Sequence, residues 1–115
     1  MANIYKNSKL DLTTNNATTL YVVPGNSRAI LKSILVSSDN ASATTVTVDL
    51  FNGDPAASAD KFTLFQTKAV AANASEQLLT EPLIMLENEV IQITAADANR
   101  LFVVASILEI NREDS

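Results

Sequence analysis

Residues 18–37 read TTLYVVPGNSRAILKSILVS, and this stretch decides the fold class. Its first part, Thr18 to Val23, is a β-branched and aromatic run that is typical of a strand. Residues 24–26 (Pro-Gly-Asn) then form a turn, because proline presets φ and the other two residues tolerate a positive φ. The run from Arg28 to Ser37 predicts a second strand.

That second strand is apolar on both faces. By the period of two, one face carries Ile30, Ile34 and Val36, and the other carries Leu31 and Leu35. A strand that is apolar on both sides is covered on both sides, so we expect it at the centre of a sheet. Lys32 interrupts the first face and should lie near a strand end or extend its amine to solvent.

Short strand patterns separated by polar turns continue along the chain. Thr44 to Phe51 alternates apolar and polar residues, which predicts a half-solvated strand. Further strands are expected over residues 61–68, 77–80, 83–86 and 90–94, the first with an irregular register that indicates a β-bulge.

The closing strand, Leu101 to Ile110, is expected at the buried centre of its sheet. One face carries Phe102, Val104, Leu108 and Ile110, and the other carries Leu101, Val103, Ala105 and Ile107. We expect Val104 to lie in the core and to be intolerant of aspartate, because burying an unpaired carboxylate costs several kcal/mol.

These patterns predict an all-β fold, a single antiparallel sandwich of two sheets. A jelly roll is favoured over an immunoglobulin-like sandwich because the chain has no Cys and no Trp. Within its 115 residues we expect an N-terminal arm or first strand over residues 1–14, the sandwich over residues 15–110 and a polar C-terminal tail over residues 111–115.

The composition argues against an enzyme. The chain has no His and no Cys, so it lacks the usual base of a nucleophilic triad and the thiolate ligands of zinc and iron–sulfur sites. Two carboxylate groupings remain, one for glycoside hydrolysis and one for a hard cation. We interpret both as solvated turns and expect no catalytic, cofactor or metal site; the residues are Glu76, Glu81, Glu87 and Glu89 in the first grouping, and Asp49, Asn52, Asp54 and Asp60 in the second.

Charge and hydropathy exclude two classes of partner. The net charge is −5 and the eight basic residues are scattered, which argues against nucleic acid. The first ten residues do not resemble a signal peptide, and the longest apolar run, residues 101–105, is far too short to cross a bilayer, so we expect a soluble protein with no membrane partner. The charge is uneven: residues 1–38 carry four basic residues and one acidic residue, whereas the remainder is strongly acidic.

The leading segment is the candidate assembly interface. It combines apolar anchors with basic residues, and it either docks on a neighbouring subunit or on another protein, its charge meeting acidic surface, or forms a first strand of its own domain. The candidate residues are Ile4, Tyr5, Lys6, Lys9, Leu10 and Leu12. Tyr5 is also the one aromatic residue outside the strand patterns, where a sugar-binding platform would need one.

Two stretches carry a resemblance to a known class of proteins. They are residues 11–40 and 98–110, with the pieces LYVVP at 20–24, ILKSILV at 30–36 and an Ala-x-Arg-Leu entry at 98–101 into the closing strand. In this order they resemble small virion structural proteins of tailed bacteriophages, particularly those of aquatic and cyanobacterial phages.

The resemblance implies a non-enzymatic particle component without a cofactor. It implies a capsid decoration or cement protein that binds the head surface as a homo-oligomer, a trimer being favoured, with the major capsid protein or another virion protein as partner. The expected location is the virion, assembled in the host cytoplasm. The alternative is a tail, neck or fibre module, in contact with host glycans.

Overall fold

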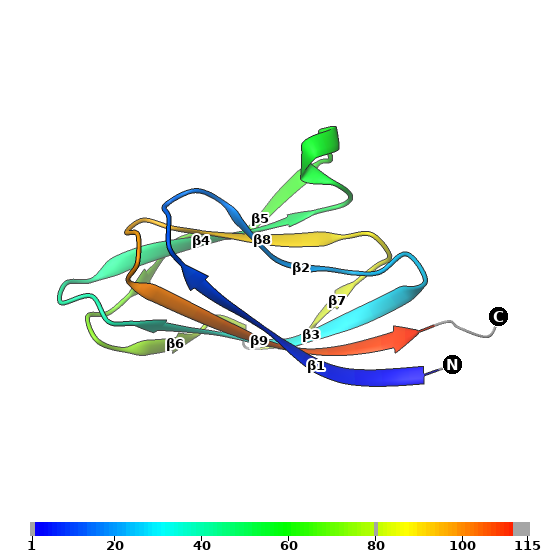
Figure 1. Cartoon of the computed structure of the whole chain (residues 1–115), viewed down its shortest axis with the longest axis horizontal. Helices are drawn as coiled ribbons and strands as arrows, with labels where there is room; N and C mark the ends of the chain where they lie inside the picture. Colours follow the sequence, from blue (N-terminus) through cyan, green and yellow to red (C-terminus); the bar gives the residue numbers. More distant parts are fainter. Residues whose placement is uncertain (1, 80, 112–115) are drawn as a thin grey trace.

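The computed structural model describes residues 2–79 and 81–111, which form strands joined by short turns (Figure 1). A single 3-10 turn, η1 (Pro55–Ala57), lies between two of the strands. The strands are β1 (Ala2–Leu12), β2 (Thr18–Val22), β3 (Ser27–Ser38), β4 (Thr44–Phe51), β5 (Lys61–Val70), β6 (Ser75–Gln77), β7 (Leu83–Met85), β8 (Val90–Ala95) and β9 (Leu101–Asn111). No helix in these two ranges could cross a membrane.

The strands form two antiparallel sheets that face each other. Sheet A has the order β1-β9-β3-β6, with β7 also paired to β3, and sheet B has the order β2-β8-β4-β5. The pairing is nested: β4 pairs with β5, β3 with β6 and β7, β2 with β8, and β1 with β9. One long hairpin is thus rolled into a sandwich, which is the arrangement of a jelly roll. The predicted fold class is confirmed.

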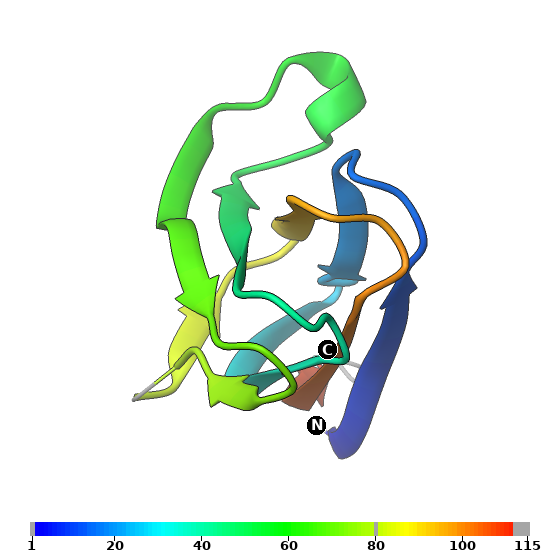
Figure 2. The ribbon, with the colours of Figure 1, turned by 90° about the vertical axis from the view of Figure 1, so that its left-hand side faces the viewer.

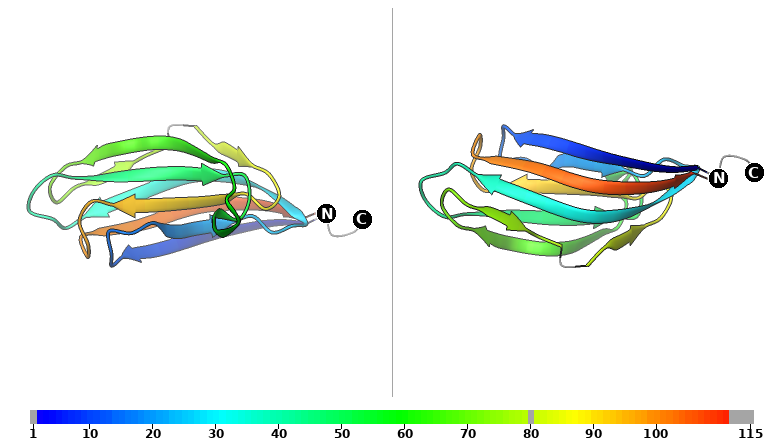
Figure 3. Two further views of the ribbon diagram at one scale, coloured as in Figure 1. Left: turned by 90° about the horizontal axis from the view of Figure 1, so that it is seen from above. Right: turned by 90° about the horizontal axis from the view of Figure 1, so that it is seen from below.

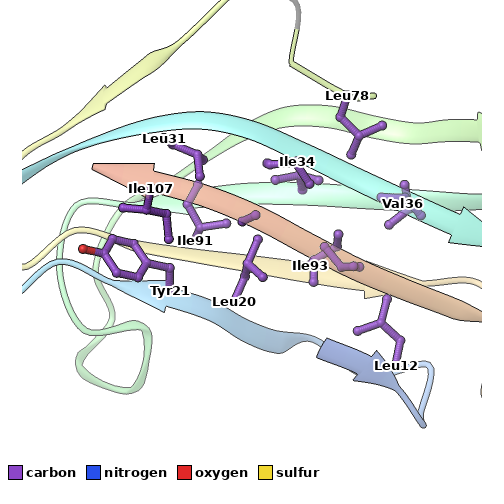
Figure 4. Packing of buried hydrophobic residues seen from close by; sticks show 14 of the residues in the cluster. Leu12, Leu20, Tyr21, Leu31, Ile34, Val36, Leu78, Ile91, Ile93 and Ile107 are labelled. Atoms are coloured by element: carbon purple, nitrogen blue, oxygen red, sulfur yellow. The ribbon is translucent and has the colours of Figure 1, made fainter. Parts of the chain in front are cut away.

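The core lies between the two sheets and is almost entirely aliphatic (Figure 4). Strands β3 and β9 supply it from sheet A, and β4 and β8 supply it from sheet B, because alternate side chains along each strand point inward. The largest side chains with less than 2% exposure include Leu12, Leu31, Ile34, Ile91, Ile93 and Leu101.

A β-bulge at Lys32 changes the faces of β3. Leu31 pairs with Ile107 and Ser33 with Ser106 of β9, so Lys32 is an extra residue without a partner there. The bulge places Leu31 on the same buried face as Ile34 and leaves Ile30 on the opposite face. The central position predicted for this strand is confirmed, but the predicted grouping of Ile30 with Ile34 is wrong, because strict alternation ignores the extra residue.

Strand β9 is central in sheet A, as predicted, but its two faces differ. Leu101, Val103 and Ala105 are fully buried, whereas Phe102 is 42% and Val104 is 38% exposed. The expectation that Val104 lies in the core is therefore wrong: the outer face of the sheet is apolar without being covered.

Three smaller expectations have different outcomes. The bulge predicted near residues 61–68 is confirmed, since the register of β4 and β5 shifts twice around Val48. The strand predicted over residues 77–80 is displaced: β6 ends at Gln77, and Thr80 lies outside the described residues. Of the tail expected over residues 111–115, Asn111 is the last residue of β9 and the rest lies outside the described residues.

Candidate assembly surface

The leading segment forms β1, the edge strand of sheet A (Figure 3). It pairs with β9 in one unbroken antiparallel register, from Ala2 opposite Asn111 to Leu12 opposite Leu101. Its side chains alternate between the core and the outer face of the sheet. The six candidate residues are therefore divided between two faces.

Three of the six are engaged within their own chain. Leu12 is fully buried, and the half-buried Leu10 packs against the core. Lys6 places its Nζ 3.2 Å from Oε2 of Glu109 and 5.9 Å from the ring centroid of Tyr21. Leu12 and Leu10 thus contribute to the core, whereas the Lys6 side chain is 43% exposed and stays accessible beside its contact with Glu109.

The partners of Lys6 form a buried polar network across the two sheets. Glu109 is 4% exposed and accepts hydrogen bonds from the Lys6 ammonium and the Tyr21 hydroxyl. Burial, assisted by the hydrogen bond and the charge of Glu109, raises the pKa of Tyr21 well above its usual value. The phenol therefore stays protonated and donates to a carboxylate that would otherwise be costly to bury.

The other three candidate residues remain accessible. Tyr5 is 75% exposed and Ile4 is 42% exposed, and Lys9 is also exposed. Tyr5 and Lys9 lie on the outer face of sheet A, together with Asn7. Beside Tyr5 there is a shallow depression of about 310 Å³, which Asn7, Lys32 and Ser106 also line.

The outer face of sheet A carries an apolar row that crosses four strands. Tyr5 of β1 lies opposite Leu108 of β9, which lies opposite Ile30 of β3, which lies opposite Ile84 of β7. Nearby, Val104 of β9 lies opposite Leu35 of β3. We define the apolar outer face as the exposed or half-buried side chains of Tyr5, Ile30, Leu35, Ile84, Phe102, Val104, Leu108 and Ile110.

The outer face of sheet B is polar by comparison. A row across its four strands consists of Thr19, Gln92, Asp49 and Thr63, in the order β2, β8, β4, β5. Gln92 donates to Thr19 at 3.2 Å, and Thr63 donates to Asp49 at 2.7 Å. The outer face of sheet B is therefore mostly polar, whereas that of sheet A carries an apolar patch among polar side chains such as Asn7 and Lys9. An apolar patch of this kind is typical of an interaction site.

Most of the apolar outer face was missed as a surface in the sequence. The sequence contains a sign of it, because residues 28–37 and 101–110 have apolar residues at both odd and even positions. It was interpreted as burial on both sides within one molecule. Of the residues that form the apolar outer face, Tyr5 alone is among the six candidate interface residues.

In the β4–β5 loop, one carboxylate and one side-chain amide hold the backbone. Asp54 accepts from the amide of Ala56 at 2.9 Å and caps η1, while the Asn52 side chain accepts from the amide of Asp60 at 3.1 Å. In the first grouping, Glu76 lies 3.8 Å from Lys68, and Glu89 accepts from the amide of Leu86 at 2.8 Å. Within the described ranges, no three acidic residues are grouped closely enough to hold a metal ion.

Comparisons with known proteins support the fold alone. No family model matches the chain, and no curated protein matches it by sequence. Solved structures with the same fold include a T13 particle of infectious bursal disease virus (TM-score 0.57, 7% identity), the capsid of Helicobacter pylori bacteriophage KHP30 (TM-score 0.55, 10% identity) and the disulfide-linked pili of Bacillus endospore appendages (TM-score 0.54, 12% identity).

The extent of these matches differs. The match to the bursal disease virus protein covers 93% of this chain but only 30% of that protein, so the chain spans about a third of its length. The phage capsid and pilus matches cover 96% and 95% of this chain, and 89% and 88% of the other chains.

Proposed function

We propose that this protein is a non-enzymatic structural component of a virus particle, a decoration or cement protein that binds the head surface as a homo-oligomer. The observation that carries the proposal is the jelly roll with an apolar patch on the outer face of sheet A and a mostly polar outer face on sheet B. The exposed side chains of Tyr5, Ile84 and Val104 on this sheet face are suited to burial against another protein surface.

The structural likenesses support this proposal through the fold. Two of the three matched structures belong to virus particles, and the third forms pili, so each is a subunit of a repeating assembly. The pili are described as disulfide-linked, whereas this chain has no cysteine. Its assembly would therefore rest on non-covalent contacts, with the trimer implied by the sequence resemblance as the proposed oligomer and the major capsid protein as the proposed partner.

A second candidate is a tail, neck or fibre module that contacts host glycans. Tyr5 favours it, because an aromatic ring that is 75% exposed can stack on a sugar. The same ring lies within the apolar outer face, so one surface would serve either role. Saturable binding of the isolated protein to a glycan array would favour this candidate over the first.

The test uses heads of the phage that encodes the chain, stripped of this protein. The wild-type protein should bind them at a fixed stoichiometry and raise their melting temperature. Ile84→Arg should abolish binding, because Ile84 is 66% exposed on the apolar outer face. Ala69→Arg, at an exposed outward position of β5 in sheet B, is the matched control and should bind normally. Equal binding by both variants would contradict the proposed surface, and no binding by the wild type would contradict the cement role.

A further inference from the structure

The edges of the two sheets are protected unequally. An unprotected edge strand presents a row of free N–H and C=O groups and pairs readily with another chain. In the part of the chain that is described, the far edge of sheet A is formed by two strands of three residues each, β6 and β7. In sheet B, the edge strand β2 has five residues with a register shift, and β5 is bulged and contains Thr67 at a φ of 46°.

Strand β1 is neither short nor bulged, and its edge is protected only by its charged side chains, Lys6, Lys9 and Asp11. It has 11 residues, pairs with β9 without a register shift, and has no proline. Strand β1 is the last strand of sheet A, so β9 pairs with one of its edges and no described strand pairs with the other (Figure 2). The link to sheet B is local, with the Ser8 hydroxyl donating to the carbonyl of Leu20 at 2.6 Å.

We propose that β1 pairs antiparallel with β1 of a second copy of this chain, about a two-fold axis at Asn7. The two copies of sheet A then form one continuous sheet, in which the apolar outer faces of both copies lie on the same side. Because a two-fold contact joins only two copies, it would link copies from different trimers of the proposed assembly, and its biological meaning rests on that proposed function. Its test needs only the isolated chain, so either proposal can fail without the other.

Two-fold symmetry limits the possible registers. In an antiparallel pair, hydrogen-bonded and non-hydrogen-bonded positions alternate, so symmetry-related strands must have one residue facing its own copy. An axis at Asn7 pairs all 11 residues of β1. An axis at Lys6 would place two ammonium groups opposite each other, which is destabilising. An axis at Ser8 would leave Ala2 and Asn3 without partners.

The Asn7 register also brings complementary side chains together. On the outer face, Tyr5 lies opposite Lys9 of the second copy, where an ammonium can pack on an aromatic ring. On the inner face, Ile4, 42% exposed in the single chain, lies opposite Leu10 of the second copy. Among the directly opposed pairs of described residues there is no like-charge pair. Exposed apolar area on β1 is covered without a directly opposed pair of like charges.

Cysteine cross-linking tests the axis directly, because the chain has no cysteine of its own. Directly opposed residues have Cα atoms about 4.5 to 5.5 Å apart, within the range that a disulfide can bridge. Asn7→Cys should therefore form a disulfide-linked dimer under mild oxidation. Asn3→Cys is the matched control, on the same face of the same strand, and should remain monomeric in the denaturing gel. Cross-linking at position 3 but not 7, or equally at both, would overturn the register.

A charge pair at position 5 tests the contact without cross-linking. Both Tyr5→Glu and Tyr5→Lys remove the ring, but only the glutamate faces Lys9 of the second copy with opposite charge. Since the contact occurs twice per dimer, the dimer dissociation constant of Tyr5→Lys should exceed that of Tyr5→Glu by about tenfold at low salt. The chain's overall charge of −5 would favour the reverse order. The reverse order, or a wild-type chain that sediments as a monomer at every concentration, would contradict the proposal.

Discussion

At the scale of single residues, the buried carboxylate of Glu109 is the most demanding feature of the molecule. It lies between the sheets with 4% exposure, and it is stabilised by donors from two other strands, Lys6 of β1 and Tyr21 of β2. If one of the two donors is removed, the buried carboxylate keeps its desolvation cost but loses a hydrogen bond that offset it. The hydrogen bonds of Glu109 therefore help to hold the edge strand β1 against the rest of the sandwich.

Tyr21→Phe should lower the free energy of unfolding by about 1 to 3 kcal/mol at neutral pH, because Glu109 loses a donor. The pKa of Tyr21 is raised on folding, so its contribution is complete below the usual phenol value of about 10 and is lost as the pH rises above it. Denaturant unfolding at about pH 8 and about pH 11 should show the gap between wild type and variant narrowing at high pH. A gap that is unchanged or wider would contradict the role given to the phenol.

Neighbouring residues of β9 should respond oppositely to a charge. Val103→Asp places a carboxylate in the core and should cost several kcal/mol or prevent folding, because Val103 is fully buried. Val104→Asp should fold, with a loss of about 1 kcal/mol from poorer strand propensity, because Val104 is 38% exposed. Thermal melts of the two variants compare them directly. Similar melting temperatures would mean that the two faces of β9 are assigned incorrectly.

At the scale of elements, the bulge at Lys32 decides which residues of β3 face the core. Leu31 and Ser33 pair with consecutive residues of β9, so removing Lys32 would leave a regularly alternating strand with Leu31, Ile34 and Val36 inward. Bulges bend a strand and increase its twist, but this one supplies no core side chain.

Deleting Lys32 should therefore leave the fold intact, with a free energy of unfolding within about 1 kcal/mol of wild type. Deleting Leu35 is the matched control, since it turns Val36 and the residues after it toward the wrong face and should cost several kcal/mol. Circular dichroism and denaturant unfolding of both deletions give the comparison. Equal loss in both would contradict the bulge assignment.

The sequence predicted the strands well and their environment less well. Turn residues such as Pro24 and Gly25 act locally, so the strand ends could be predicted from composition. Whether Phe102 faces a second sheet or solvent depends on pairing with residues far along the chain, which local alternation does not encode. The same limit applies to the candidate interface, where Tyr5 is exposed but Leu12 is fully buried in the core.

At the scale of the whole molecule, the nested pairing joins the two ends of the chain. Ala2 lies opposite Asn111, and the Lys6–Glu109 contact spans 103 residues of sequence. Pairing residues so far apart in sequence costs chain entropy, because a long loop must close before the outer strands can pair. Folding should therefore be slow for a domain of this size. The β4–β5 loop lies at the closed end of the nested hairpin, and its 3-10 turn η1 has no buried residue. This loop therefore contributes little to the core.

A circular permutant tests this topology. Joining the chain ends by a Gly/Ser linker and opening the chain between Ala57 and Ser58 should preserve the fold, because both residues are exposed. Its melting temperature should lie within a few degrees of wild type. Opening the chain between Val103 and Val104 is the control and should prevent folding. If neither permutant folds, the β4–β5 loop is needed for the fold, which would contradict this prediction.

The central claim concerns what covers the apolar outer face, and it is tested most directly on intact particles. The measurement is cross-linking with mass spectrometry on gradient-purified particles of the virus to which we propose that this protein belongs. The protein should be present in many copies per particle, with cross-links from Lys9 and Lys32, which are exposed on the outer face of sheet A, to a second copy or to the capsid protein. Purified particles that lack the protein, or cross-links confined to the polar face of sheet B, would contradict it.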